Sequence, residues 1–266
     1  MAVPEHVTRD WLEAYRALLA NQGLNAANVL SAALQPAPEP QPALFSLAQM
    51  LAQPKLLTGQ LDQESARKMA ARGPEHDRLH RATLTVLHQD FALKIIAPLV
   101  LRLFRDGAAP APDPERIFLC HLDSGNSESH WRQVQANGPA LQTEAFIAAI
   151  SEQMSAWYPV FRVHYGVSPG AYWSSVGLAL GAPFSAVWNR ADPTTLCALA
   201  TAWLNQFRCD ANRFIDWIPA QFSNQPCALP QRRGCCLKYL LPDGGYCGTC
   251  GIYRKERLKA LSLSCK

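Results

Sequence analysis

Apolar residues recur every three to five positions across residues 75–104, and this spacing predicts a long helix. Its apolar positions are Leu79, Leu84, Leu87, Phe91, Ile95 and Leu99. We expect a bend at Pro98, because proline lacks the N–H that an interior helical residue donates. The most apolar run, residues 95–101, is well short of the roughly 20 residues that a membrane-spanning helix needs.

Two further helices follow from similar patterns. Residues 142–165 are amphipathic, and an irregularity is expected at Pro159. The apolar face of this segment carries Phe146, Ile150, Met154 and Trp157. Residues 194–207 form a second predicted helix, with Asp192 as its cap and Pro193 in its first turn.

One strand and two connectors complete the predicted elements. Residues 116–122 are a short apolar run ahead of the turn-rich residues 123–126, a pattern typical of a strand. Proline-rich residues 36–42 and 108–114 indicate extended connectors. The fold class predicted from these elements is α+β, with a predominantly α-helical body and a minor β component.

The C-terminal end of the chain differs in character from this body. It is rich in cysteine and glycine and lacks helical periodicity, so we expect a small irregular segment that binds a cluster. The predicted division is an N-terminal helical segment at residues 1–35, a mostly helical body at 43–229 and the cluster-binding segment at 230–266. Its tail, residues 251–266, is expected to cover the site or to contact a partner.

Composition and charge narrow the function classes. The chain has 48% hydrophobic residues, enough to fill an ordinary core. It has 25 Lys+Arg against 21 Asp+Glu and no long basic block, so no nucleic-acid partner is expected. The first residues are acidic and amphipathic where a secretory signal has a basic start and an apolar run. We therefore expect a cytoplasmic protein with reduced thiols.

Four of the nine cysteines are close together near the C-terminal end. Cys235 and Cys236 are adjacent, ten residues separate them from Cys247, and two more precede Cys250. One loop can gather these four thiolates, which is the ligand set of a [2Fe-2S] cluster. The spacing therefore predicts that all four cysteines hold a cluster.

Zinc is the alternative occupant, since four cysteines also form zinc sites. Adjacent Cys235 and Cys236 point their side chains apart, which suits two irons better than one tetrahedral ion. A disulfide between these two cysteines would be strained. Gly234 and Gly248 are expected to let the backbone pass close to the metal, and amides in residues 247–250 to donate to the sulfurs.

The sequence RRGCCLKYLLPD at residues 232–243, followed by CGTC at residues 247–250, resembles the C-terminal signature of FhuF-type ferric siderophore reductases. The C-C-x10-C-x2-C spacing is the specific part of this resemblance. It implies a bacterial cytoplasmic protein, sometimes associated with the inner face of the membrane, that reduces iron in hydroxamate-type siderophores. The four cysteines carry over as cluster ligands, and no catalytic residue beyond the cluster is assigned.

The predicted function is one-electron reduction of Fe(III) in a bound siderophore, which releases Fe(II). Its expected partners are the ferric siderophore and an unidentified cytoplasmic electron donor, and a peripheral contact with the inner membrane is compatible with it. Two alternatives stay open: a non-catalytic [2Fe-2S] electron carrier or sensor, and a structural zinc-binding module.

Residues outside the four cysteines have more than one interpretation. Arg232 and Arg233 either act on the cluster or its donor by their charge, or form a solvated basic turn. Four aromatic residues either line a siderophore pocket or belong to the core, and the core is favoured. They are Tyr172, Trp173, Trp203 and Trp217.

Overall fold

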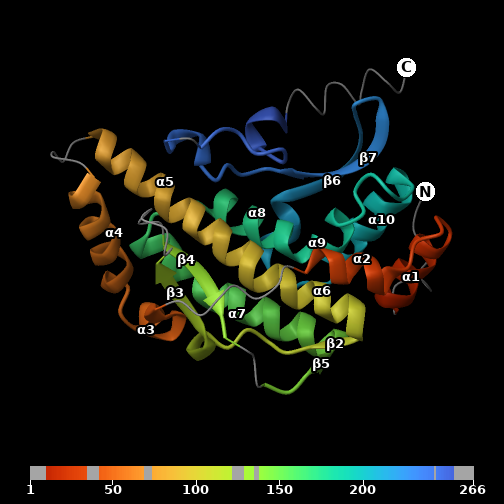
Figure 1. Cartoon of the computed structure of the whole chain (residues 1–266), viewed down its shortest axis with the longest axis horizontal. Coiled ribbons are helices and arrows are strands. Elements are labelled where there is room, and N and C mark those ends of the chain that lie inside the picture. The colour runs from red at the N-terminus through yellow and green to blue at the C-terminus, as the bar shows by residue number, and fades with distance from the viewer. Residues whose placement is uncertain are drawn as a thin grey trace.

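The longest helical run of the protein crosses the centre of the fold in the computed structural model (Figure 1). The structure describes residues 10–34, 42–68, 74–121, 129–134, 138–242 and 244–254. The run consists of α5 (Pro74–Phe91), the π-helix η2 (Ala92–Ile96) and α6 (Ala97–Asp106). The long helix predicted from the apolar spacing is therefore confirmed.

The irregularity in this helix differs from the predicted bend at Pro98. In the π turn, the Ala97 N–H donates to the carbonyl of Ala92. Pro98 then falls in the first turn of α6, where its missing N–H is not needed. Because the helix continues, the 30 residues of Asp77–Asp106 are long and apolar enough to cross a membrane, unlike the short run considered alone. Of its most apolar window 67% is buried inside the fold, as in the core helix of a soluble protein.

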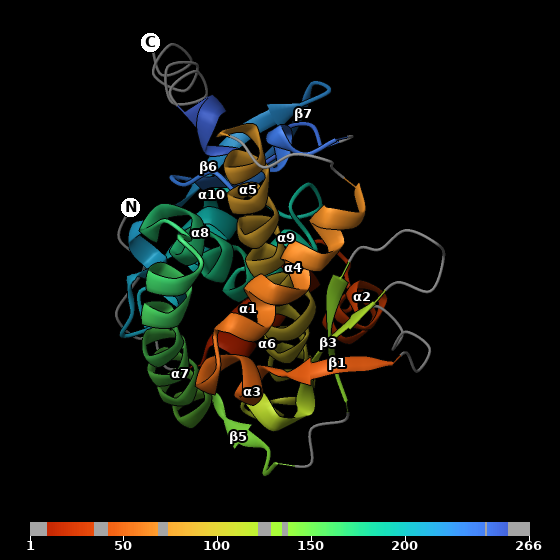
Figure 2. The same ribbon diagram turned by 90° about the vertical axis from the view of Figure 1, so that its left-hand side faces the viewer.

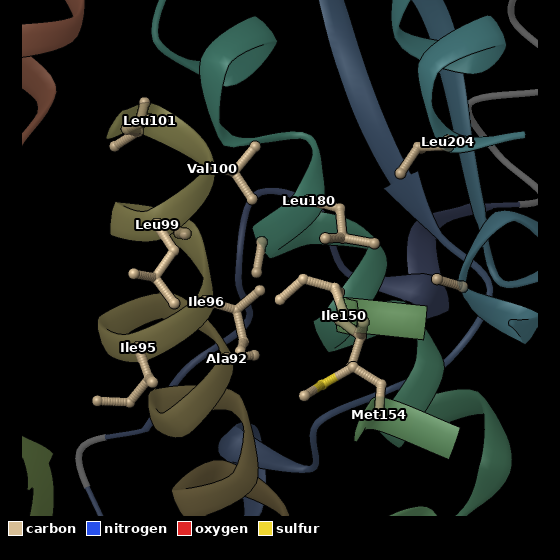
Figure 3. Close-up of a cluster of buried hydrophobic side chains, with 14 of the residues drawn as sticks. Ala92, Ile95, Ile96, Leu99, Val100, Leu101, Ile150, Met154, Leu180 and Leu204 are labelled. Atoms are coloured by element: carbon tan, nitrogen blue, oxygen red, sulfur yellow. The ribbon is translucent and has the colours of Figure 1, made fainter. Parts of the chain in front are cut away.

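Helices α7 (Thr143–His164), α8 (Pro169–Leu180) and α10 (Pro193–Leu204) complete the core around this central helix. Figure 3 shows Ile96 of the central helix turned toward Ile150 and Met154 of α7. Both predicted helices, α7 and α10, are confirmed. Asp192 caps α10 by accepting a hydrogen bond from the Thr195 N–H. The irregularity expected at Pro159 is absent from α7, which continues through this proline.

Three small antiparallel sheets flank the helices. β1 (Ala43–Ser46), β3 (Ile117–His121) and β4 (Ser129–Gln133) form one sheet in the order β1-β3-β4, and β3 confirms the predicted strand. A second sheet pairs β2 (Ala108–Ala109) with β5 (Leu141–Gln142), so the predicted connector at 108–114 begins as a strand. Most of the other connector, the turn at 123–126 and residues 255–266 of the tail lie outside the described residues.

The third sheet is a hairpin that the sequence patterns did not predict. β6 (Ile215–Phe222) pairs with β7 (Gln225–Arg232) through eight residue pairs, from Ile215 opposite Arg232 to Phe222 opposite Gln225. Ser223 and Asn224 form the two-residue turn, both with positive φ, as the favoured hairpin turn requires. Figures 1 and 2 both place the hairpin at one end of the molecule, next to α10 and α8. The hairpin connects the helical core to the segment that carries the four cysteines.

In the described part of the chain most residues are helical and a minor share are in strands, which confirms the predicted α+β class with a helical body. The remaining elements are α1 (Trp11–Ala20), α2 (Ala26–Ala33), α3 (Leu47–Ala52), α4 (Lys55–Lys68), α9 (Ala182–Ser185), η3 (Pro114–Arg116), η4 (Asp210–Arg213), η5 (Lys238–Leu240) and η6 (Gly251–Tyr253). The division of the chain into three segments stays a prediction.

Candidate metal centre

The chain after β7 forms the cysteine loop, which we define as residues 233–254. Its first half carries Cys235, Cys236 and the short helix η5, which packs against α5. Its second half carries Cys247 and Cys250 and ends in η6. The structure therefore brings both cysteine-bearing turns to the end of one strand.

Hydrogen bonds attach the second half of the loop to the end of β7. The buried Gln231 amide donates to the carbonyls of Arg232 and Cys250, each at 2.9 Å. The Arg232 N–H donates to the Thr249 carbonyl at 3.1 Å. Gly234 lies directly against Gly170 in the first turn of α8. Gly234 was expected to let the backbone pass close to a metal. Its lack of a side chain instead allows a close approach to another backbone segment.

The four sulfurs lie near each other and form two pairs. The Cys236 thiol lies within hydrogen-bonding reach of Cys247, and the Cys250 thiol within reach of Cys235. The adjacent cysteines therefore have different partners, as expected from side chains that project apart. Cys236 and Cys250 are each 2% exposed, whereas Cys235 and Cys247 are half-buried. Each pair thus joins one buried and one more accessible sulfur.

Each sulfur also accepts a hydrogen bond from the backbone N–H two residues further along. The Leu237 N–H donates to Cys235 Sγ at 3.4 Å. The other three donors are the N–H groups of Lys238 to Cys236, Thr249 to Cys247 and Ile252 to Cys250. Such N–H groups stabilise thiolate charge and raise the reduction potential of an iron-sulfur cluster. The expected amide donors are therefore present in both halves of the loop.

One cysteine pair shares a proton unequally. The hydrogen bond from Cys236 lowers the pKa of Cys247 to about 5, with the charge of Arg232 and hydrogen bonds from Thr249 acting in the same direction against burial. The same hydrogen bond, together with burial, raises the pKa of Cys236. At neutral pH the pair therefore holds a thiolate on Cys247 beside a thiol on Cys236. A thiolate is the form in which cysteine binds metal.

This arrangement fits a binuclear cluster better than a single ion. A [2Fe-2S] cluster takes two thiolates on each of two irons. Two cysteine pairs, each sulfur already facing a backbone N–H, match that requirement. The geometry therefore favours the cluster over the zinc alternative.

Comparison with known protein families agrees with the geometry. Residues 232–250 match the family model of the FhuF 2Fe-2S C-terminal domain. We refer to these 19 matched residues as the 2Fe-2S domain. The match indicates a [2Fe-2S] cluster as the cofactor, as predicted. No curated protein matches the chain.

The two arginines at the start of the 2Fe-2S domain occupy different environments. Arg233 is exposed and forms an ion pair with Asp216, 2.6 Å from Nη2 to Oδ1. Arg254, at the other end of the loop, pairs with the same carboxylate at 3.1 Å. Burial tends to raise the pKa of Asp216, but the hydrogen bonds and charges of both arginines hold it below its usual value. Arg232, in contrast, is completely buried.

The remaining candidate residues belong to the core or the hairpin. Tyr172, Trp173 and Trp203 are buried within the hydrophobic core, which confirms the favoured interpretation, and Trp217 is 7% exposed on β6. The four other described cysteines are free and lie outside the 2Fe-2S domain. They are Cys120, Cys197, Cys209 and Cys227.

An apolar groove of about 1440 Å³ runs between the central helix and the β6–β7 hairpin. Leu93, Ala97 and Leu101 line one wall, and Ile218 and Phe222 lie among the residues of the hairpin wall. The groove reaches the 2Fe-2S domain at Gly248 and Thr249. The Thr249 hydroxyl lies 3.9 Å from Cys247 Sγ. Sequence reasoning missed the groove, because its walls come together only in the folded protein.

Proposed function

We propose that this protein reduces the ferric ion of a siderophore bound in the apolar groove. The cluster that passes the electron is held by Cys235, Cys236, Cys247 and Cys250. The observation that supports the reductase most directly is Thr249, which lines the groove and contacts the sulfur of Cys247.

The charge of the groove favours a neutral substrate. Asp90 and Lys94 are the two charged residues among its described lining residues, and they form an ion pair of 2.9 Å. A ferric ion bound by three hydroxamates has no net charge, whereas a ferric tris-catecholate is strongly anionic. Burying an unpaired charge in an apolar groove is unfavourable. We therefore propose a ferric hydroxamate as the substrate class.

Reduction releases the metal because of ligand preference. Hydroxamate oxygens are hard, anionic ligands that hold Fe(III) much more strongly than Fe(II). One electron leaves an external donor and one electron converts Fe(III) to Fe(II), so the transfer balances without a further reactant. A bound [2Fe-2S] cluster supplies electrons one at a time. The protein contributes the groove that holds the chelate beside Cys247 and the amides that stabilise charge on the sulfurs.

An anaerobic reoxidation experiment tests this function. The protein is reduced with one equivalent of dithionite electrons, and ferric hydroxamate chelate is then added with a ferrous trap. We expect the visible absorption of the oxidised cluster to return as the trap records one Fe(II) for each electron. A cluster that stays reduced in the presence of the chelate would leave only the carrier or sensor alternative. Metal analysis of the same sample distinguishes the reductase and the carrier or sensor from the zinc module, which would contain zinc and no acid-labile sulfide.

The cytoplasmic location, the electron donor and the peripheral membrane contact belong to the same proposal. Their support is the resemblance of the cysteine motif at residues 232–250. Fractionation of cells, with the cluster signal followed in the soluble and membrane fractions, tests the location.

A further inference from the structure

Arg232 is a completely buried cation whose hydrogen-bond acceptors are all neutral. Its Nε donates to Ser174 Oγ at 2.9 Å, and its Nη2 donates to Ser175 Oγ at 2.8 Å and to the Ala171 carbonyl at 3.4 Å. Its Nη1 donates to Gln89 Oε1 at 3.0 Å. These four bonds engage all three nitrogens of the guanidinium, but they do not balance its positive charge.

Within the described part of the chain, no ion pair balances this charge. The nearest comparable arginines, Arg233 and Arg254, share Asp216 on the surface of the hairpin. The buried neighbour His88 is held neutral, because burial and then the charge of Arg232 lower its pKa to about 3. A buried charge without a partner is costly, so such a charge is retained where something anionic accompanies it.

The cysteine loop supplies that anion on one side of Arg232. Arg232 directly precedes the loop: its N–H donates to the Thr249 carbonyl at 3.1 Å, and its own carbonyl shares the Gln231 amide with the carbonyl of Cys250. In a [2Fe-2S] site, four thiolates and two sulfides outweigh the charge of two ferric ions, and reduction adds a further negative charge. The buried cation therefore interacts more favourably with the reduced site than with the oxidised one.

We propose that Arg232 is the counter-charge of the cluster and raises its reduction potential. This inference rests on the proposed cluster ligands and is independent of the siderophore. Arg233, next to it in the sequence, has a carboxylate partner and is exposed, so its charge is already balanced and screened. The two adjacent arginines should therefore differ sharply in their effect on the potential.

The test is a spectroelectrochemical titration of the anaerobic, cluster-loaded protein. We expect Arg232→Gln to lower the midpoint potential by at least about 59 mV, which corresponds to a tenfold change in the one-electron equilibrium constant. Arg232→Lys should recover most of this loss, and Arg233→Gln should stay close to wild type. An Arg232→Gln protein with full iron content and the potential of Arg233→Gln would overturn the proposal.

Gln89→Glu separates the charge of Arg232 from its structural contacts. The substitution keeps the size of the side chain and places a carboxylate on the guanidinium at Nη1, so it balances the charge and preserves the hydrogen bond. The proposal predicts a lower potential again, by a tenfold change or more. A purely structural role for Arg232 predicts an unchanged potential, and that result would overturn the proposal. Iron loss from Gln89→Glu, in a protein that melts no lower than wild type without metal, would support it.

Discussion

Gly234 and Gly170 contact each other backbone to backbone, and a Cβ on Gly234 would overlap the carbonyl group of Gly170. This contact fixes the start of the cysteine loop against the first turn of α8. Gly248, the other glycine next to a cysteine, is different. An added Cβ at Gly248 would have no atom within 4 Å, and its φ is not positive. The loop therefore tolerates a side chain at one of these positions and not at the other.

We expect Gly234→Ala to displace Cys235 and Cys236 from Cys250 and Cys247. Relief of the overlap requires a backbone shift, so the free energy of unfolding should fall by about 3 kcal/mol. Iron and acid-labile sulfide for each chain, together with thermal melting, measure both effects. Gly248→Ala is the matched control and should retain the cluster. Equal iron content in the two variants would contradict this account of the loop.

The cysteine pairs predict which disulfides form when the metal-free protein is oxidised gently. The thiol contacts favour Cys235 with Cys250 and Cys236 with Cys247 over a strained bridge between the adjacent cysteines. Peptide mapping by mass spectrometry identifies the bridges. A dominant vicinal disulfide would disprove the pairing, although not the cluster.

Serine substitutions test the four ligands directly. Replacing any one of Cys235, Cys236, Cys247 and Cys250 should abolish most of the visible absorption, because serine is a much poorer ligand for iron. Cys227→Ser is the control, since this cysteine is buried on β7 and lies outside the 2Fe-2S domain. It should keep a full complement of iron.

His88 should make the protein sensitive to acid. Its ring stacks on Tyr172 at 4.3 Å, and neither ring nitrogen has a hydrogen-bond partner among the described residues. Burial, with the charge of Arg232 second, lowers its pKa from 6.5 to about 3, so the unfolded chain binds a proton that the folded protein excludes. Stability is therefore lost as the pH falls from 6.5 toward 3, by about 2 kcal/mol at pH 5.

His88→Phe should remove this loss and keep the aromatic packing. Urea titrations at pH 7 and pH 5 should show a smaller difference for the variant than for wild type by about 2 kcal/mol. His164→Phe changes an exposed histidine at the end of α7 and should follow wild type. If His88→Phe and wild type lose the same stability, the acid sensitivity has another source.

A charge in the apolar groove should discriminate between siderophores. Leu93 is 39% exposed and lines the groove, so Leu93→Arg adds a cation there without opening a core cavity. We expect KM for a neutral ferric hydroxamate to rise tenfold or more, and an anionic ferric chelate to be affected less. Val163→Arg, at a position that is 72% exposed on α7, is the control. An unchanged KM in Leu93→Arg would show that the groove does not bind the chelate, and would not contradict the proposed cluster.

The sequence predicted the elements whose burial follows a simple period. The central helix, α7, α10 and β3 each repeat apolar residues at the spacing of one buried face. The π turn was not predictable in this way, because its one extra residue falls within the spacing of three to five that indicated the helix. The sequence therefore predicts a bend at Pro98, whereas this proline lies in the first turn of a new α-helical segment.

The hairpin was missed because three prolines lie within its strands. Pro219, Pro226 and Pro230 argue against a central strand, and they are tolerated here because a two-stranded sheet consists of edge strands only. The Ser-Asn pair at residues 223–224 was the available signal, since it separates two runs of suitable length.

The spacing of the four cysteines identified the candidate site, but it could not distinguish Arg232 from Arg233. Arg232 is the last residue of β7 and is buried, like Gln231 before it, whereas Arg233 lies just past the strand and is exposed. The acceptors of Arg232 come from α5 and α8, more than fifty positions away in sequence, and no local pattern reports them.

The same three prolines affect how the molecule behaves at high concentration. A two-stranded sheet offers unpaired N–H and C=O groups that can template the addition of a strand from another copy. Proline has no N–H to donate, and both strands of this hairpin contain proline. The part of the protein that presents the redox centre is thereby a poor template for aggregation, even during the interval after synthesis when the metal has not yet been inserted.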